Sequence, residues 1–384
     1  MHIIFNKKVL LENLTPAMGT VSTKNTISTI EGVLIETMGG TTVRLSTYDM
    51  NKGVRVTFEA LEVSEEGSCI LNAQRFMQIV KLLGGDEITL HIDEKCNGTV
   101  TAGESSFSMY ALRGEDFPTL PELTGKRGFE VSSALLKDKI ARVIHSVADQ
   151  DSRPMLCGVY FEIEGRDMKI VSCDGYSLSI CRVNCDIEDV GEEHADRFSF
   201  ILPGSSLNEL TKILSDREQD KIRVMLARKH AVINIDRLIF FTRMIDSEYL
   251  DYHKIMPGEQ PISVKVERER FLAGLERANL IADEKIQGSS KSHVKVIVQG
   301  DKVALTSTSV NGRVHDEMPC EHTGDDVTIG FNCRYLLNHV RAAEGEYIRL
   351  GLKSPTQSMT IVPAEEKENE SYFYMLLPVR MTDA

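Results

Sequence analysis

The sequence predicts an α+β protein made of three copies of one domain, each with two helices packed on antiparallel sheets. The first supporting observation is a motif that occurs three times: the end of an apolar-periodic helix, a turn, and a strand that reads acidic-x-Ile-x-Leu or Val. Its isoleucines, Ile88, Ile222 and Ile348, are 134 and then 126 residues apart. The second observation is the length of 384 residues, which suits two or three domains. A repeat of this period exceeds a solenoid unit of roughly 20–50 residues, so each copy is a whole domain.

The first domain is expected to combine two helices with short alternating strands. Its first helix is predicted over about 8–18, directly after a strand over 2–6. Its second helix is predicted over 72–84, where apolar residues recur at helical spacing, at Phe76, Ile79, Val80 and Leu83. Three strands follow, and the run 125–128, Gly-Lys-Arg-Gly, is the first candidate linker.

The second and third domains are expected to repeat this order of elements. Their helices are predicted over 133–147, about 268–282 and about 332–343, together with one that follows Pro203-Gly204 and runs through Leu207, Leu210, Ile213 and Leu214. The Pro- and Gly-containing run 257–261 is the second candidate linker. The predicted domain boundaries are therefore 1–126, 128–257 and 261–384.

Composition points to a soluble, cytoplasmic protein. Apolar residues make up 42% of the chain and charged residues 26%, as in ordinary globular domains. No stretch approaches the roughly 18 consecutive apolar residues of a membrane helix, and the N-terminus lacks the pattern of a signal peptide. None of the eight cysteines forms a Cys-x-x-Cys pair, so we expect reduced thiols and no zinc or other metal.

No catalytic motif is found, so an enzyme is not expected, and no cofactor is implied. Phosphate-binding, nucleophile-elbow and zinc-protease patterns are all missing from the sequence. One alternative is a hydrolase that uses a nucleophile turn at Asp174-Gly175-Tyr176. No base lies at a fixed spacing from this turn, which favours a tight connection between two strands.

The charge pattern leaves two interpretations open. The net charge of −13 argues against a simple nucleic-acid binder, although net charge does not say where the charges lie. Basic residues lie off the apolar faces of the predicted helices, at Arg75, Lys81, Lys137, Arg142, Lys212, Arg268, Arg277, Arg334 and Arg341. They are either ordinary solvated residues or, if all helices face one surface, a basic lining for a negatively charged polymer.

The order of these elements and several motifs resemble the bacterial DNA polymerase III beta subunit family, the sliding clamps. The resemblance covers essentially the whole chain in the same order. It is carried by the segments 23–34, 116–118, 171–178, 329–337 and 377–380. The stretch 329–337, Ile-Gly-Phe-Asn-Cys-Arg-Tyr-Leu-Leu, is close to the most recognisable part of the family.

The resemblance implies three DNA-clamp domains per chain and a head-to-tail homodimer that closes a ring around double-stranded DNA, without sequence specificity. Head-to-tail interfaces form a closed ring only if the rotation between neighbouring chains leads back to the first chain. At this interface Phe107 and Met109 of one chain would face Leu280 and Ile281 of the other; the alternative is that these four are core residues. DNA contacts are implied for Lys24, Gln74, Arg75, Gln150 and Arg153. Gln74 stands where the family usually has a basic residue, and Pro154 and Met155 stand where some clamps carry tyrosines.

The resemblance also implies a hydrophobic groove between the second and third domains that captures short peptides. Its residues would be Leu156, Ser172, Gly175, Tyr176, Leu178, Leu250, Lys254, Ile255, Asn332, Tyr335, Ser358, Met375, Leu377, Pro378, Val379, Arg380 and Met381. Three departures from the family affect its peptide preference. Leu250 replaces a common proline, Lys254 replaces the arginine of some members, and the chain continues past Met381.

The implied function is that of a processivity factor in DNA replication. The implied partners are the DNA polymerase III alpha subunit, the clamp loader, other polymerases and repair factors, all bound through short peptide motifs. The departures at Gln74 and Leu250 leave an alternative: an accessory or mobile-element clamp paralogue with a specialised role in repair or replication.

Overall fold

The computed structural model describes the whole chain except residues 23–27, 193–195, 283–292, 310–311 and 382–384. The chain forms two compact units. The first unit comprises Met1–Lys137, Ile187–Ala195 and Ser205–Met244, and the second comprises Asp138–Asp186, Asp196–Gly204 and Ile245–Ala384. No helix among the described residues is long and apolar enough to cross a membrane.

The described residues of the first unit form two antiparallel sheets. A five-stranded sheet has the order β5-β1-β7-β8-β9, and a ten-stranded sheet has the order β10-β6-β2-β3-β4-β19-β18-β17-β11-β15. The strands are β1 (His2–Asn6), β2 (Gly32–Thr37), β3 (Thr42–Tyr48), β4 (Lys52–Glu59), β5 (Glu62–Glu65), β6 (Ser68–Asn72), β7 (Glu87–Ile92), β8 (Asn97–Ala102), β9 (Ser105–Tyr110), β10 (Leu112–Arg113), β11 (Arg127–Ser132), β15 (Glu188–Asp189), β17 (Lys221–Leu226), β18 (His230–Ile235) and β19 (Leu238–Arg243).

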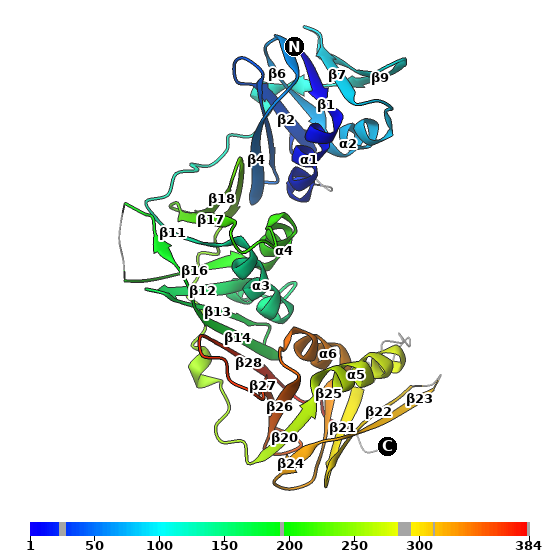
Figure 1. The fold of residues 1–384 in the computed structure, drawn as a ribbon, viewed down its shortest axis with the longest axis vertical. Helices are drawn as coiled ribbons and strands as arrows, with labels where there is room; N and C mark the ends of the chain where they lie inside the picture. Colours follow the sequence, from blue (N-terminus) through cyan, green and yellow to red (C-terminus); the bar gives the residue numbers. More distant parts are fainter. Residues whose placement is uncertain (23–27, 193–195, 283–292, 310–311, 382–384) are drawn as a thin grey trace. The chain divides into compact units, whose positions relative to one another are not determined.

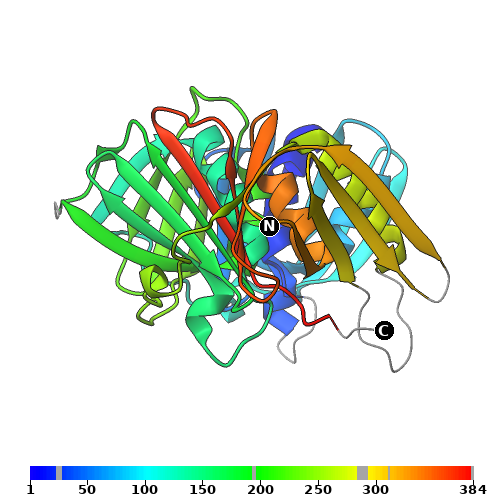
Figure 2. The ribbon, with the colours of Figure 1, turned by 90° about the horizontal axis from the view of Figure 1, so that it is seen from below.

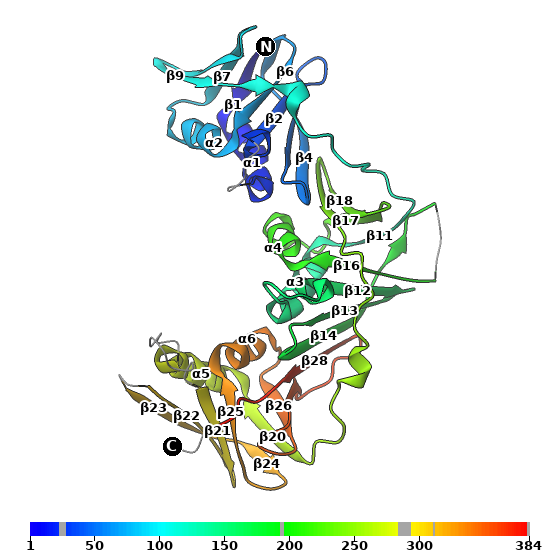
Figure 3. The ribbon, with the colours of Figure 1, turned by 180° about the vertical axis from the view of Figure 1, so that it is seen from behind.

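The first unit contains α1 (Lys7–Ala17), α2 (Ala73–Leu82) and nearly all of α4 (Gly204–Ile213), whereas α3 (Ser133–Val143) begins in this unit and continues into the second. Helices α1 and α2 pack side by side (Figure 1). The segment 117–126 runs from β10 to β11 over the ten-stranded sheet, where Figure 3 shows it in cyan. Phe117, Leu120 and Leu123 of this segment pack on a core that includes Tyr48 and Phe241.

The described residues of the second unit also form two antiparallel sheets. A nine-stranded sheet has the order β16-β12-β13-β14-β28-β27-β26-β20-β24, and a four-stranded sheet has the order β23-β22-β21-β25. Helices α5 (Arg268–Ala282) and α6 (Cys333–Ala342) pack together and cover the four-stranded sheet (Figure 2). The strands are β12 (Gly158–Glu164), β13 (Asp167–Cys173), β14 (Ser177–Asn184), β16 (Arg197–Pro203), β20 (Ile262–Glu267), β21 (His293–Gln299), β22 (Lys302–Thr308), β23 (Arg313–Pro319), β24 (Glu321–Thr323), β25 (Val327–Asn332), β26 (Tyr347–Leu352), β27 (Met359–Pro363) and β28 (Glu370–Leu376).

The threefold repeat predicted from the sequence is visible in one hydrogen bond that occurs three times. The first residue of each of the helices α1, α3 and α5 donates its backbone N–H to the backbone carbonyl of the acidic residue in the repeated turn. The bonds join Lys7 to Asp86 at 2.7 Å, Ser133 to Asp220 at 2.7 Å and Arg268 to Glu346 at 2.8 Å. The first N–H groups of a helix have no partner within the helix, and each of these bonds provides one. Each bond also connects the start of the first helix of a repeat to the turn that follows the second helix.

Most predicted helices agree with the structure to within two residues, but α3 ends four residues before the predicted end. The Ser172 hydroxyl donates to the Val143 carbonyl at 2.5 Å. The Val147 N–H bonds to the Ile144 carbonyl, three residues back, which is the pattern of a 3₁₀ turn. The chain therefore continues as a single 3₁₀ turn, Ile144–Ser146.

The exact domain boundaries stay a prediction. Strand β4 pairs with β19 and β14 pairs with β28, so each large sheet continues across a predicted domain junction. Backbone pairing of this kind joins part of the second repeat to the first repeat in one unit and the rest of it to the third repeat in the other unit.

Candidate functional site

The predicted groove residues lie together in the second unit, where β14 pairs with β28. This pairing places Leu178 opposite Met375. Both side chains belong to one apolar cluster with Leu156, and Leu250 packs against it. Leu156, Leu178 and Met375 are buried and form the floor of the candidate groove.

The rim of the candidate groove exposes large apolar side chains. Tyr176 is 62% exposed, Ile255 42% and Leu377 41%. The Tyr176 ring stacks near that of Tyr335, with centroids 6.2 Å apart. Exposed aromatic and aliphatic groups beside a buried apolar floor are suited to the anchor side chains of a short peptide.

The C-terminal segment closes one side of the groove through backbone hydrogen bonds. The Leu377 N–H donates to the Tyr176 carbonyl at 2.9 Å, and the Val379 N–H donates to the Gly330 carbonyl at 2.8 Å. Pro378, between them, has no N–H to satisfy. A side chain at Gly330 would come within 2.8 Å of Met381, so the glycine makes room for the end of this segment.

The turn at Asp174 is a structural connection between β13 and β14, as the absence of a base in the sequence indicates. One carboxylate oxygen of Asp174 accepts hydrogen bonds from the Tyr176 N–H at 2.9 Å, the Ser177 N–H at 2.7 Å and the Ser177 hydroxyl at 3.1 Å. Gly175 has a φ of 87°, which a glycine adopts without strain. This carboxylate oxygen stabilises the turn that presents Tyr176.

A buried polar network under this turn was not predicted from the sequence. The Ser177 hydroxyl lies 3.0 Å from the Ser146 hydroxyl, and the Ser146 hydroxyl lies 3.4 Å from His339 Nε2. The second ring nitrogen of His339 lies 2.6 Å from the Tyr335 carbonyl, so Nδ1–H donates there and Nε2 accepts. His145 meets His339 edge to face, with centroids 4.5 Å apart. The spacing of these residues in the sequence gives no signal of their contact, because they belong to different repeats.

Burial keeps both histidines neutral. It lowers the pKa of His339 to about 4, and it also holds the pKa of His145 well below its ordinary value, with His339 as a second cause. In the unfolded chain both groups bind protons near their ordinary pKa of about 6.5. The unfolded state therefore binds more protons below that pH, and the folded state loses stability as the pH falls.

We expect the free energy of unfolding of the second unit to fall by about 3 kcal/mol between pH 6.5 and 4 through His339 alone. Urea unfolding at a series of pH values measures this slope. In His339→Gln the slope over this range should become shallower, whereas carboxylates such as Asp138, whose pKa is lowered, act at more acidic pH. An equal slope in the variant would contradict the assignment.

A polar pocket of about 740 Å³ adjoins the candidate groove. Its lining includes Gln150, Tyr176, Asn332 and Tyr335, so Gln150 lies beside the groove as well as being a predicted DNA contact. Arg153 is 55% exposed and binds the Asp151 carboxylate through Nε at 3.0 Å and Nη2 at 3.1 Å. Among the remaining predicted groove residues, Lys254 is exposed and paired with Asp251 at 3.1 Å, and Asn332 caps the start of α6.

The basic residues of the helices are mostly paired with carboxylates. Six of the nine basic helix residues named from the sequence make such pairs: Lys137 with Asp216, Arg142 with Glu344, Lys212 with Glu209, Arg268 with Glu269, Arg277 with Asp316 and Arg341 with Glu276. Arg75, Lys81 and Arg334 have no ion pair among the described residues. Gln74 and Arg75 are exposed in the first turn of α2, and Lys24 lies outside the described residues.

The predicted interface residues lie at the edges of two sheets. Strand β9 ends the five-stranded sheet and carries Phe107, which is 40% exposed, and Met109, which is buried. Strand β23 ends the four-stranded sheet, and α5 packs beside it with Leu280 75% exposed and Ile281 partly buried. An unpaired edge strand offers its backbone groups to another strand, so both edges are suited to pairing between chains.

These features define a class of protein: an α+β scaffold of three repeats, with a candidate apolar groove and with open sheet edges at β9 and β23. Profiles of three successive domains match the chain in order. They are the DNA polymerase III beta subunit N-terminal domain over residues 1–121, the central domain over 130–251 and the C-terminal domain over 253–380. The chain belongs to the DNA polymerase III beta subunit family.

Individual relatives agree with this assignment along the full length. The beta sliding clamp of Halalkalibacterium halodurans is 26% identical, over 99% of this chain and all of the relative. The beta sliding clamp of Staphylococcus epidermidis is 24% identical, over 99% of both chains. Among solved structures, the DNA polymerase sliding clamp of Bacillus subtilis has a TM-score of 0.88 at 23% identity, with both chains fully covered. A DNA polymerase III beta subunit from Eubacterium rectale also gives 0.88 at 23% identity, over 99% of this chain and all of the other. These two structures support the same fold.

Proposed function

We propose that this chain is a processivity clamp. Two copies close head to tail into a ring around duplex DNA and tether the replicative polymerase to it, without catalysis. The observation that carries this proposal is the match of all three clamp domains, in order, along the whole chain.

The open sheet edges support ring closure. In the proposed dimer, β9 of one chain pairs with β23 of the other, and Phe107 meets the apolar end of α5 at Leu280. The two edges differ, so each chain binds the β23 edge of its partner through β9 and the β9 edge of its partner through β23. A head-to-tail ring requires two different surfaces of this kind.

The paired cations of the helices support a ring that holds DNA by enclosure. Each phosphate that a protein neutralises adds to the salt dependence of its binding. With most helix cations engaged by carboxylates, few groups such as Arg75 and Arg334 are left for phosphate contacts. A clamp with few contacts slides with little resistance, and its retention depends on topology.

The candidate groove supports recruitment of partners through short peptides. The partners proposed are the DNA polymerase III alpha subunit, the clamp loader, other polymerases and repair factors, in the cytoplasm. The exposed Tyr176, Ile255 and Leu377 would receive apolar anchor side chains, and the backbone of the C-terminal segment would hold the peptide in register.

A specialised clamp paralogue is the second candidate, favoured by Gln74, which is exposed on α2 without a charge, and by Leu250 in the groove. The same ring would then serve a restricted set of partners. A gene position beside the replication initiator supports the main clamp, and a second clamp gene elsewhere in the same genome supports the paralogue.

The test of the proposed function is retention on closed DNA. The protein is loaded onto nicked circular duplex DNA with a clamp loader and ATP, and the complex is passed through a sizing column at high salt. Coelution with the circle supports the proposal, and release from it at high salt opposes it.

A further inference from the structure

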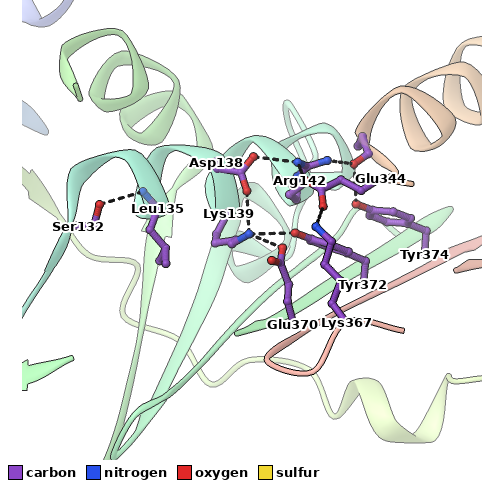
Figure 4. A network of polar contacts seen from close by, with 11 residues as sticks. Ser132, Leu135, Asp138, Lys139, Arg142, Glu344, Lys367, Glu370, Tyr372 and Tyr374 are labelled. Atoms are coloured by element: carbon purple, nitrogen blue, oxygen red, sulfur yellow. Dashed lines mark hydrogen bonds and ion pairs between the residues drawn. The ribbon is translucent and has the colours of Figure 1, made fainter. Parts of the chain in front are cut away.

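A network of charged and aromatic side chains joins three elements of the second unit, and it makes no part of the groove itself. It comprises Asp138, Lys139, Arg142, Glu344, Lys367, Glu370, Tyr372 and Tyr374 (Figure 4). These residues come from α3, from the end of α6 and the turn after it, and from β28 with the residues before it.

Lys139 connects α3 to β28. Its ammonium group is almost fully buried and bonds to the carboxylates of Asp138, at 2.8 Å, and Glu370, and to the Tyr372 hydroxyl at 2.9 Å. Burial alone would lower the pKa of Lys139, but the hydrogen bonds and charges of the two carboxylates raise it. The group therefore stays charged, and it stays bound to β28.

Arg142 connects α3 to the end of α6. Its guanidinium group donates to the Ala342 carbonyl at 2.7 Å and to Asp138 at 2.9 Å, and it is paired with Glu344. The Tyr374 hydroxyl donates to the same Ala342 carbonyl at 3.2 Å. Lys139 and Arg142 both lie over the Tyr372 ring, 5.4 and 5.2 Å from its centroid, which adds cation–π attraction.

The carboxylate oxygens of Asp138, Glu344 and Glu370 lie within 4.8 Å of one another. Such a group has the ligand chemistry of a cation site. Here the positive charge between the carboxylates comes from Lys139 and Arg142, so these carboxylates form ion pairs within the chain.

The elements that meet in this network also carry the groove at their opposite ends. Helix α6 begins at the Asn332 cap with Tyr335 in its first turn and ends at Ala342 in the network. Strand β28 begins with Glu370 and Tyr372 in the network and ends at Met375 and Leu376, next to Leu377. A shift at one end of such a short, packed element moves the other end.

We propose that Lys139 and Arg142 are positioning residues: they form a clasp that fixes the far ends of α6 and β28 against α3 and so holds the walls of the apolar groove in register. This inference rests on the proposed function of the groove. Because coupling is reciprocal, a peptide bound in the groove also stabilises the clasp.

The test measures the affinity of a fluorescent peptide copied from a clamp-binding segment of a bacterial replicative polymerase, using the full-length protein. Arg142→Met is expected to weaken binding roughly three- to thirtyfold, the range seen when residues without ligand contact modulate a coupled site. Arg142→Lys, which keeps the charge but loses the planar fork, should restore part of the affinity. The control is Arg341→Ala, which removes an exposed ion pair of α6, the helix whose end Arg142 binds, and it should leave the affinity unchanged.

A second measurement uses the unaltered protein, so its result does not depend on whether a variant folds. Amide hydrogen exchange of the unaltered protein should slow around 138–142 and 342–344 when the peptide binds. Full affinity in Arg142→Met, or unchanged exchange at these segments, would overturn the clasp. Failure of the unaltered protein to bind the peptide would instead overturn the proposed groove, so the two failures are distinguishable.

Discussion

Replacing Leu280 with aspartate is expected to convert the proposed dimer into monomers. Leu280 is 75% exposed in the single chain, so the substitution removes little packing within the fold. In a closed ring it would remove roughly 1.5–3 kcal/mol of apolar burial and bury an unpaired charge at each interface. A loss of about 3 kcal/mol at each of two interfaces weakens dimerisation by roughly 10⁴-fold. Light scattering at micromolar concentration measures the mass.

The matched control is Leu377→Asp, which places the same charge at an exposed leucine of the groove. This variant should remain dimeric, and both variants should keep the circular dichroism of the unaltered protein. A Leu280→Asp protein that still has the mass of a dimer would show that the end of α5 lies outside the interface. A monomeric unaltered protein would contradict the ring itself.

Ending the chain after Leu376 is expected to abolish peptide binding and to leave the dimer intact. The truncation removes exposed Leu377 and the backbone groups that bond to Tyr176 and Gly330. Loss of one central anchor residue typically costs 2 kcal/mol or more, so removal of this whole side of the groove should reduce affinity by more than about 100-fold. Fluorescence anisotropy with the polymerase-derived peptide measures the affinity.

A chain that ends after Met381 is the control for this truncation. It lacks only residues 382–384 and keeps the segment that bonds to the groove, so it should bind the peptide like the full-length protein. Neither truncation touches β9 or β23, and both proteins should have the mass of a dimer. Full peptide affinity in the shorter chain would show that the groove lies elsewhere.

The repeated architecture was predictable because its signals are local. The apolar spacing within α2 and the acidic residue of each repeated turn lie within a few residues of the structure that they specify. Asp86, Asp220 and Glu346 mark the turns whose carbonyls accept from the first helix of each repeat. The groove residues were proposed from a family resemblance, and the structure brings Leu178, Tyr176, Met375 and Leu377 together through the pairing of β14 with β28.

The remaining features depend on contacts between distant residues. The sequence indicates that Lys137 and Arg341 lie off an apolar helix face, but it does not indicate that carboxylates on other segments pair with them. His145 and His339 lie in different repeats, 194 residues apart in the chain, and their rings are in contact. The Val143 carbonyl at the end of α3 accepts a hydrogen bond from the Ser172 hydroxyl, 29 residues further along the chain. Pairings of this kind are decided by tertiary packing, which local periodicity does not encode.

The most direct measurement of the central claim compares retention of the loaded protein on circular DNA before and after a single cut. The protein is labelled, loaded onto nicked circular duplex DNA and isolated at high salt, and a restriction enzyme then opens the circle at one site. A ring that encloses DNA by topology slides off the new ends, so we predict stable retention on the circle and rapid release after the cut. Equal retention on circular and linear DNA would contradict enclosure and would indicate a protein held by direct contacts.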